Sequence, residues 1–224
     1  MINVNNLYIR VKDLSQKNRA GYFSVDEYNR HLQDALNLLF EYYAEDFEKT
    51  GKIIDSLRPF IKKGDLAISN SFCDFPTDYR HYLSLAYRNV VNSETCGENP
   101  TIDIIGMDYR ATDEWDDAND SPIRKPNIAK RVVAYRFINS QIEVSQQRGT
   151  VQMTYLSKPT GAVMGYTVDS GTLEEVYNAG TSVQIPFLEQ DETNLTDIIL
   201  FLLGIQIRET SLIQWVSAKR QMFK

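Results

Sequence analysis

Apolar residues recur at steps of three and four between residues 28 and 47, which is the spacing of one face of an α-helix. Ser24-Val-Asp-Glu27 stands before this run and has the form of a capping box, in which the serine hydroxyl accepts a hydrogen bond from the glutamate amide. Gly51 follows the run and can end a helix in the left-handed conformation. The pattern therefore predicts a long amphipathic helix between Ser24 and Gly51.

A second N-terminal helix is expected to begin at Phe75-Pro-Thr-Asp-Tyr79. Proline is favoured in the first turn of a helix, and the Asp78 carboxylate would complement the helix dipole. Aromatic and aliphatic residues recur from Tyr79 to Val90 and would form its apolar face. Gly97-Glu-Asn-Pro100 then ends the helical part of the chain.

Three segments further along are rich in β-branched and aromatic residues that alternate with polar ones, which is the pattern of strands with one packed face. These segments are 131–138, 141–144 and 151–156. Turns are expected at Asn139-Ser140 and at Gln147-Arg-Gly149, because Asn and Gly tolerate positive φ. The segments predict an antiparallel meander. Shorter strand patterns extend the β region on either side of it, at 101–105 and 183–185.

Two further helices are expected towards the C-terminus. Apolar residues between Leu195 and Leu203 share one face of the first, and Gly204 marks a break after it. The second should run from about residue 210 to 224, and it combines a tryptophan with a cationic end, formed by Trp215, Lys219, Arg220 and Lys224. Trp and Arg dominate interface energies when they are buried, so this helix is predicted to dock on a partner. The alternative is an ordinary bundle helix with solvated lysines.

Residues 1–20 carry four cations against Asp13 alone and show no sustained periodicity. Few apolar residues are present to offset the backbone entropy that ordering would cost. A flexible N-terminal arm is therefore predicted, which orders on a neighbour in an assembly. A poorly ordered terminus is the alternative.

Together these elements predict an α+β protein. Two N-terminal and two C-terminal helices would form a helical bundle, and an antiparallel β region would be inserted between them. The expected divisions are an arm at 1–20, a bundle made of 21–98 and 187–224, and a β region at 99–186.

The composition narrows the classes of function. The 224 residues carry a formal net charge of −6, so the chain lacks the dense Lys and Arg on which general nucleic-acid affinity depends. An acidic surface can still line a conduit through which DNA slides. Cys73 and Cys96 form neither a disulfide framework nor a zinc-ligand spacing. The longest apolar run, 195–207, is too short to span a bilayer, and no signal-peptide core is found, so a cytoplasmic place of assembly is expected.

No nucleotide-binding, nucleophile-elbow or metalloprotease motif occurs along the chain. The two histidines, His31 and His81, are predicted on different helices. The sequence therefore gives little support for catalysis by a histidine general base. We therefore expect no enzymatic activity and no catalytic, cofactor-binding or metal-binding residues. A pair of carboxylates that meets in space stays an alternative, because the chain has 30 acidic residues.

Two neighbouring segments carry opposite charge. Residues 113–120 form an acidic loop that lacks the Gly and Glu of a calcium-binding EF-hand, and a basic segment follows at 124–136. In a ring, the acidic loop of one subunit can lie against the basic strand of its neighbour, whereas pairing within one chain is the alternative. The candidate interface residues are Asp113, Glu114, Asp116, Asp117, Arg124, Lys125, Arg131 and Arg136, together with Trp215, Lys219 and Arg220 of the last helix.

Several short motifs follow one another in an order that covers most of residues 20–220. They are Gly21-Tyr-Phe-Ser24, Glu27-Tyr-Asn29, Leu57-Arg-Pro59, Phe75-Pro-Thr-Asp-Tyr79, Ser121-Pro122, Lys125-Pro126, Thr154-Tyr-Leu-Ser-Lys-Pro159 and the apolar segments 198–207 and 212–219. In this order the chain resembles the head-to-tail connector proteins, also called adaptor or ring proteins, of short-tailed, crAss-like bacteriophages.

The resemblance implies a non-enzymatic virion protein that needs no cofactor and lies at the head-to-tail junction. Such a protein would form a homo-oligomeric ring, twelve-fold to match the portal, and would contact the portal protein and other connector or tail proteins. Packaged DNA would pass through its channel without sequence-specific binding, and no membrane would be involved. The alternative is a small non-enzymatic binding module, or a tail or capsid accessory protein.

Overall fold

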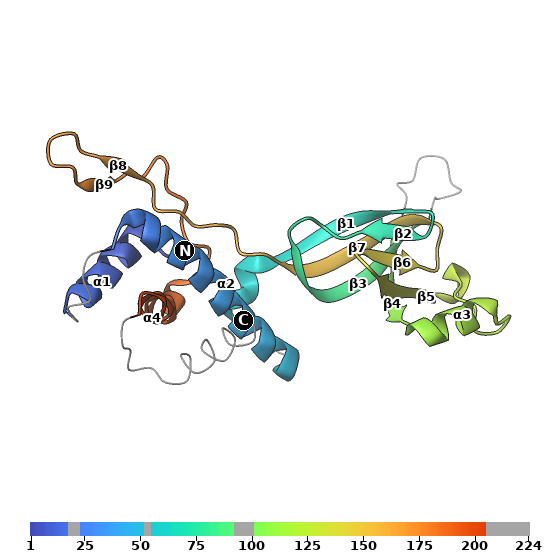
Figure 1. Ribbon diagram of the computed structural model, residues 1–224. Coiled ribbons are helices and arrows are strands. Elements are labelled where there is room, and N and C mark those ends of the chain that lie inside the picture. The colour runs from blue at the N-terminus through green and yellow to red at the C-terminus, as the bar shows by residue number, and fades with distance from the viewer. Residues whose placement is uncertain (18–22, 52–54, 92–100, 205–224) are drawn as a thin grey trace. The chain divides into compact units, whose positions relative to one another are not determined.

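The computed structural model of the protein describes residues 1–17, 23–51, 55–91 and 101–204 (Figure 1). The chain forms two compact units. The helical unit comprises Met1–Phe60 and the chain from Lys158 onward, and the barrel unit comprises Ile61–Ser157. The barrel unit is therefore an insertion between two parts of the helical unit.

Seven strands of the described residues close into a barrel, in the order β1-β2-β6-β5-β4-β3-β7. Neighbouring strands are antiparallel except β4 and β5, which are parallel. The pairing of β1 with β7, from Ile61 opposite Leu156 to Ser69 opposite Arg148, closes the barrel. The strands are β1 (Ile61–Ser69), β2 (Phe72–Asp74), β3 (Tyr79–Val91), β4 (Thr101–Tyr109), β5 (Val133–Ile138), β6 (Gln141–Val144) and β7 (Arg148–Ser157).

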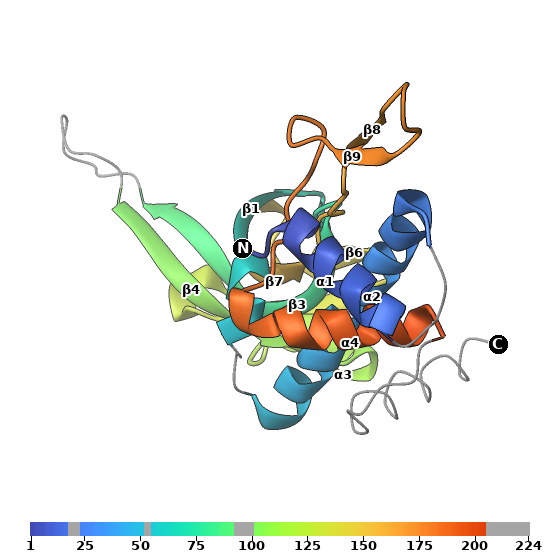
Figure 2. The same cartoon turned by 90° about the vertical axis from the view of Figure 1, so that its left-hand side faces the viewer.

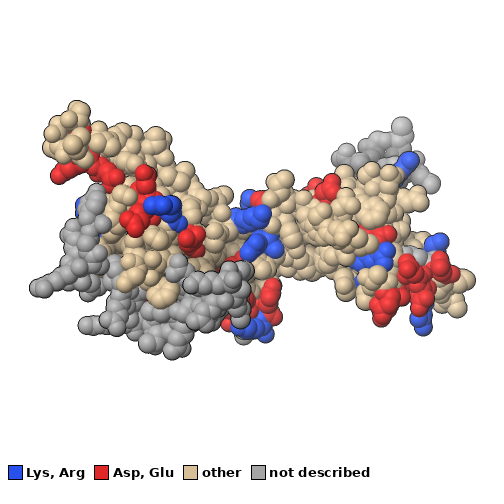
Figure 3. Space-filling view, in the orientation of Figure 1, with Lys and Arg blue, Asp and Glu red and all other residues tan. Residues whose placement is uncertain are grey.

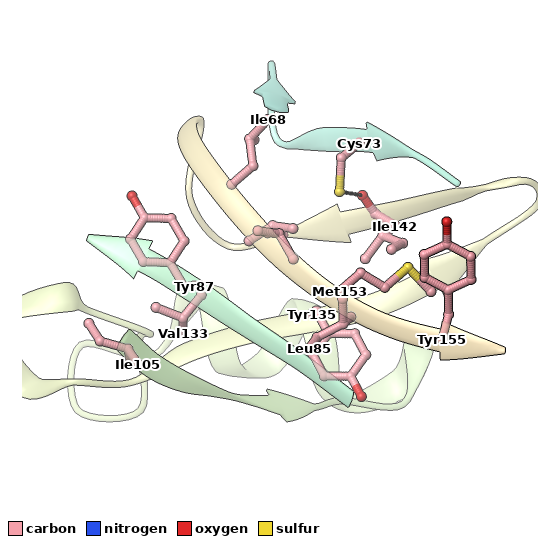
Figure 4. Close-up of a cluster of buried hydrophobic side chains, with 12 residues drawn as sticks. Ile68, Cys73, Leu85, Tyr87, Ile105, Val133, Tyr135, Ile142, Met153 and Tyr155 are labelled. Atoms are coloured by element: carbon pink, nitrogen blue, oxygen red, sulfur yellow. Dashed lines mark hydrogen bonds between the residues drawn. The ribbon is translucent and has the colours of Figure 1, made fainter. Parts of the chain in front are cut away.

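The interior of the barrel is filled by one face of each long strand. In β7, Val151, Met153 and Tyr155 are buried, whereas the polar residues between them are more exposed. The alternation that the sequence predicts for β6 and β7 is thus confirmed. Figure 4 shows these side chains inside the barrel, which comprise Ile68, Cys73, Leu85, Tyr87, Ile105, Val133, Tyr135, Ile142, Val144, Val151, Met153 and Tyr155.

Cys73 is a buried free thiol in this core. Its Sγ donates a hydrogen bond to the backbone oxygen of Ile142 at 3.6 Å, drawn as a dashed line in Figure 4. Burial raises the pKa of the Cys73 thiol to about 11. The thiol therefore stays protonated at neutral pH and behaves as a small apolar side chain.

The described part of the helical unit contains three α-helices and a small hairpin. The hairpin formed by β8 and β9 projects from the helices in both ribbon views (Figures 1 and 2). Helix α4 contacts both α1 and α2. The elements are α1 (Val4–Lys17), α2 (Val25–Thr50), the 3-10 helix η1 (Asp55–Phe60), β8 (Tyr166–Val168), β9 (Glu175–Tyr177), the 3-10 helix η3 (Glu189–Asp191) and α4 (Glu192–Leu202).

Helix α2 confirms the first predicted helix and its caps. Ser24 has an extended backbone, and its Oγ accepts a hydrogen bond from the amide of Glu27 at 3.2 Å. Gly51 has a φ of 66°, and its N–H donates to the backbone oxygen of Phe47 at 2.7 Å. The apolar face is buried as predicted, through Val25, Tyr28, Leu32, Ala35, Leu36, Leu39, Phe40, Tyr43 and Ala44.

A buried polar network joins α2 to the segments beside α4. The Oδ1 of Asp191, a residue only 2% exposed, accepts hydrogen bonds from the hydroxyls of Tyr43 and Ser56, both at 2.8 Å. The Asn194 side-chain amide donates to the Tyr43 hydroxyl at 3.0 Å. Burial, reinforced by the hydrogen bond to Asp191, raises the pKa of Tyr43 to about 12. The network therefore requires a neutral tyrosine.

The observed architecture differs from the predicted helical bundle with an inserted antiparallel β region. The insertion is a closed barrel that begins at Ile61 and ends at Ser157, not a β region at 99–186 within a bundle of 21–98 and 187–224. The reason is that β1 and β3 find their partner in β7, far along the chain. Local periodicity contains no information on such pairing.

The predicted second helix was wrong, because Tyr79–Val91 forms strand β3. Its register against β7 shifts twice, between Tyr79 and His81 and between Tyr82 and Ser84. Each irregularity places an extra residue in one strand and moves the apolar positions out of strict alternation. The core-facing residues Tyr79, Tyr82, Leu85 and Tyr87 are therefore spaced by three, three and two, and together with apolar residues on the other face they imitate the period of a helix.

The predicted meander was correct only in its first hairpin. Strands β5 and β6 pair through a turn in which Asn139 has a φ of 51°, as expected. Strand β6 then pairs with β2, and β7 pairs with β1 and β3. Arg148 and Gly149, which were expected in a turn, belong to β7.

The predicted arm was also wrong, because residues 4–17 form helix α1. Val4, Leu7 and Val11 are fully buried, and these positions follow helical spacing. Ile2 adds a backbone bridge to Ile185, with its N–H donating at 3.2 Å. The burial of these apolar side chains within the helical unit thus offsets the backbone entropy that is lost when the segment becomes ordered.

Because Tyr87 packs closely on Gly149, the barrel should be sensitive to substitution of this glycine. Gly149 has a φ of 127°, and a Cβ added there would lie 2.8 Å from Cε2 of Tyr87. We expect Gly149→Ala to lower the free energy of unfolding of the barrel by about 2 kcal/mol or more, through backbone strain and steric overlap. Urea denaturation followed by circular dichroism measures this.

Gly106→Ala is the matched control. A Cβ at Gly106 would meet no atom within 4 Å, and its φ is not positive. Its effect should stay within about 0.5 kcal/mol. Equal effects of the two substitutions would contradict the assigned role of Gly149.

The raised tyrosine pKa values predict a loss of stability at alkaline pH. The pKa values of Tyr43 in the helical unit and of Tyr155 in the barrel are both raised to about 12 from an ordinary 10.0, first of all by burial. Their neutral forms stabilise the folded state in full below pH 10, and this contribution is lost as the pH rises from 10 towards 12. Unfolding titrations at each pH should show this fall. Tyr43→Phe should be less stable near neutrality but should lose less stability over that interval, and an unchanged slope would refute the assignment.

Candidate interaction surfaces

One candidate surface is a two-stranded ribbon at the end of β3 and the start of β4. Val90 pairs with Ile102, and the ribbon extends away from the rest of the barrel (Figure 2). Val90, Ile102 and Ile104 are 56%, 46% and 53% exposed. Among the described residues, β4 has no second strand partner before Met107. The ribbon therefore combines exposed β-branched side chains with an unpaired sheet edge.

The second candidate surface is the tip of hairpin β8–β9. Asp169 organises the tip, because its Oδ1 accepts hydrogen bonds from the amides of Gly171 at 2.7 Å and Thr172 at 3.0 Å. These amides hold the pKa of the Asp169 carboxyl below its usual range. Leu173 follows with a φ of 59° and is 79% exposed. A left-handed conformation costs a leucine about 1–2 kcal/mol, so the tip presents a strained apolar side chain to solvent.

The strands of this hairpin are fastened to the start of α2. Glu175 Oε2 accepts a hydrogen bond from the amide of Val25 at 3.1 Å, and the Tyr166 hydroxyl donates to Asp26 at 3.1 Å. A carboxylate at a helix N-terminus is favourable because the exposed amides there carry partial positive charge. The hairpin is thus held through its strands, whereas residues 169–174 of its tip are exposed to solvent.

The third candidate surface is an open groove on the barrel unit. It lies between the loop of Lys125–Ile128 and the start of β7, over the side chain of Tyr87. Tyr87 is buried, and its hydroxyl donates to the backbone oxygen of Arg148 at 3.1 Å. Lys125 and Arg148 are exposed at the groove, and neither forms an ion pair with the described part of the chain. We call this surface the basic groove.

The predicted acidic loop is helix α3 (Thr112–Asp120). Trp115 and Ala118 are buried on one side of it, and the acidic side chains gather on its exposed side (Figure 3). The expected solvated acidic surface is present, but on a helix. Its carboxylates are Asp113, Glu114, Asp116 and Asp117, of which Glu114 forms a long ion pair with Arg110 at 4.0 Å.

Two of the predicted basic interface residues are paired within the barrel unit. Arg136 Nε lies 2.6 Å from Glu143 Oε2, with only 13% and 16% of the two side chains exposed. The Arg136 guanidinium also lies 5.0 Å from the centre of the Trp115 ring, which fastens α3 to β5. Arg131 contacts Asp103 at 3.0 Å. Neither arginine pairs with the acidic side chains of α3.

The other predicted residues divide into two groups. Arg124 and Lys125 are exposed, and Lys125 lines the basic groove. Trp215, Lys219 and Arg220 lie outside the described residues, as does the predicted helix at 210–224. Arg148 and Leu173 are not among the interface residues expected from the sequence. An apolar residue inside a run of turn residues, Asp169–Glu174, was the available signal for Leu173.

Aromatic side chains gather at one end of the barrel. The rings of Phe75 and Tyr79 stack with centres 4.4 Å apart, and Phe137 lies 5.7 Å from Phe75. The Tyr135 hydroxyl donates to that of Tyr82 at 2.8 Å. Phe137 remains 37% exposed, so this aromatic end is open to solvent in part.

Comparison with models of known protein families and with curated proteins finds no match to this chain. In the ranges that the structure describes, no helix has the length and apolar character needed to cross a membrane. The same ranges contain no group of three His, Cys, Asp or Glu side chains placed to hold a metal ion. A functional proposal therefore depends on the surfaces described above.

The pairing of Arg136 predicts an effect on folding. Arg136→Ala should lower the free energy of unfolding by about 2 kcal/mol, because it leaves the largely buried Glu143 carboxylate without its partner. Arg131→Ala is the control, since its ion pair is mostly exposed and should contribute less than about 1 kcal/mol. Urea unfolding of both variants gives the comparison. Equal losses, or none for Arg136→Ala, would show that the buried pair is not stabilising.

Proposed function

We propose that this protein is a structural virion component, a connector that forms a ring at the head-to-tail junction of a short-tailed bacteriophage. The order of motifs along the sequence supports this role. In the structure, the observation that supports it best is the exposed apolar ribbon of β3 and β4. The role is non-enzymatic and places the protein in the virion after assembly in the bacterial host.

The ribbon has the properties of an assembly element. Three exposed β-branched side chains on a free sheet edge favour association, since an added strand satisfies the backbone groups and covers the side chains. A soluble monomer gains nothing from such an edge, whereas a subunit of a virion covers it with another component. In the proposed role that component is the portal protein or a tail protein.

The negative net charge of the chain suits a channel through which DNA slides. A net charge of −6 does not support tight binding to phosphates, so packaged DNA would pass through the ring without being held. The ring would consist of copies of this chain, matched in symmetry to the portal.

A small binding module is the second candidate function, and the aromatic end of the barrel favours it. Half-exposed rings such as Phe137 offer a flat apolar surface with hydroxyl groups beside it. A ligand bound there would quench or shift tyrosine fluorescence in the isolated protein without any oligomer. Assembly in the absence of such a ligand favours the connector.

Substitutions in the ribbon should impair assembly without affecting folding. Ile102→Thr combined with Ile104→Thr keeps β-branched side chains on the strand but removes apolar surface. We expect an unchanged unfolding midpoint and at least a tenfold loss in binding of the portal protein encoded by the same genome. Negative-stain microscopy and light scattering of the mixture measure ring formation.

Matched controls accompany this test. Val183→Thr changes a valine of the helical unit that is 46% exposed, as Ile102 is, and should leave portal binding unchanged. A portal protein from an unrelated phage should not bind. If the wild-type chain neither forms rings nor binds its portal, the proposed function is wrong.

A further inference from the structure

We infer that the tip of hairpin β8–β9 of one copy docks in the basic groove of the next copy. This inference rests on the proposed function, because it assigns the contact between copies in the ring. It replaces the predicted contact between residues 113–120 and 124–136, whose arginines at 131 and 136 already have partners in the same unit.

The tip is built to present one apolar side chain beside negative charge. Residues 167–174 are all exposed, and Leu173 is held outward by the turn that Asp169 organises. Glu174 follows it, and its side chain is exposed and makes no hydrogen bond or ion pair with the described residues. The hairpin segment from 161 to 185 contains three acidic residues and no Lys or Arg. Backbone strain at an exposed leucine points to a role outside the monomer, since the fold gains nothing from it.

The basic groove offers the complementary chemistry. Its apolar base is formed by Tyr87 and Ile128, and Pro126 lies at its side. Lys125 and Arg148 supply two cations that have no ion pair with the described residues, and none of the described carboxylates lines the groove. A leucine seated over the Tyr87 ring would bring a following glutamate within reach of both cations. Complementary charge of this kind selects the partner and its register.

A second surface depression, on α1, fits the tip less well. It is lined by Ile9 and Leu14 but also by Asp13, which would repel Glu174. Its cation, Arg10, is already paired with Glu192 at 3.2 Å. The basic groove is therefore the better match for the hairpin.

The contact joins two different surfaces and is therefore heterologous. Each copy offers one tip and one groove, so the contact repeats and closes into a ring when the rotation between copies allows it. A ring built this way has no unpaired tip or groove.

Two complementary variants test the contact. The tip variant carries Leu173→Asn and Glu174→Lys, and asparagine tolerates the left-handed backbone at this position. The groove variant carries Lys125→Glu and Arg148→Glu. The control carries Lys63→Glu and Lys158→Glu, which gives the same change in charge at exposed lysines outside the groove. Thermal unfolding shows that each variant is folded, and the single changes Leu173→Asn and Lys125→Glu replace any double variant that is not.

Sedimentation velocity, with and without the portal protein, reads out assembly. Wild type and control should assemble alike, whereas the tip variant and the groove variant should each associate at least tenfold more weakly. An equimolar mixture of the two variants should associate again, because one supplies a working groove and the other a working tip, and the reversed charges of the altered tip and the altered groove are also complementary. Leu173→Asn should also unfold at the same temperature as wild type or higher, which no core role of Leu173 would allow.

Three outcomes overturn the inference. If wild type assembles and both variants assemble equally well, the docking is wrong while the proposed function stands. If the variants are monomeric alone and also when mixed, the tip and the groove are not each other's partners between copies. If wild type stays monomeric even with the portal protein, both the docking and the ring are wrong.

Discussion

The pairing of β1 with β7 is the constraint on which the rest of the barrel unit depends. It places Ile61, where the chain enters the barrel, opposite Leu156, just before the chain leaves it. An insertion whose two ends lie side by side does not force apart the segments that flank it. The helical unit can therefore close on itself through long-range contacts such as the bridge between Ile2 and Ile185. In the ribbon of β3 and β4, β4 has no second strand partner before Met107 in the described chain, and this free edge carries exposed apolar side chains.

Pairing within the barrel unit decides which charges remain available to partners. Arg136 is held by Glu143 and by the Trp115 ring, and it serves to attach α3 to the barrel. A charge that is largely buried and paired contributes to stability when it is intact and is costly to expose, so it is poorly suited to a reversible contact between subunits. Lys125 and Arg148 lie on exposed segments without carboxylate partners in the described chain. Whether a cation is already paired within its own unit therefore distinguishes structural cations from candidate interface cations better than the density of charge along the sequence does.

The two projecting hairpins differ in how they carry exposed apolar surface. The β3–β4 ribbon offers a flat edge that a strand can extend, and its side chains have ordinary extended backbone. The β8–β9 tip offers a single leucine on a turn with defined hydrogen bonds. A flat edge suits a partner that contributes backbone, whereas a tip with one side chain suits a groove. Hydrogen bonds between the start of α2 and the side chains of Tyr166 and Glu175 hold the β8–β9 hairpin within the helical unit.

The sequence by itself determined the features that depend on near neighbours in the chain. The caps of α2 at Ser24 and Gly51, its buried face and the turn at Asn139 follow from side chains and backbone preferences within a few residues. The tertiary structure alone decided the rest. Pairing with β7 and β4 makes β3 a strand despite its helix-like spacing, which two irregularities in the pairing accommodate, and burial in the helical unit orders α1. The basic groove exists only because long-range pairing brings Lys125, Tyr87 and Arg148 together. Such contacts are set by which strands meet in space, and the period of a pattern does not encode the identity of a distant partner.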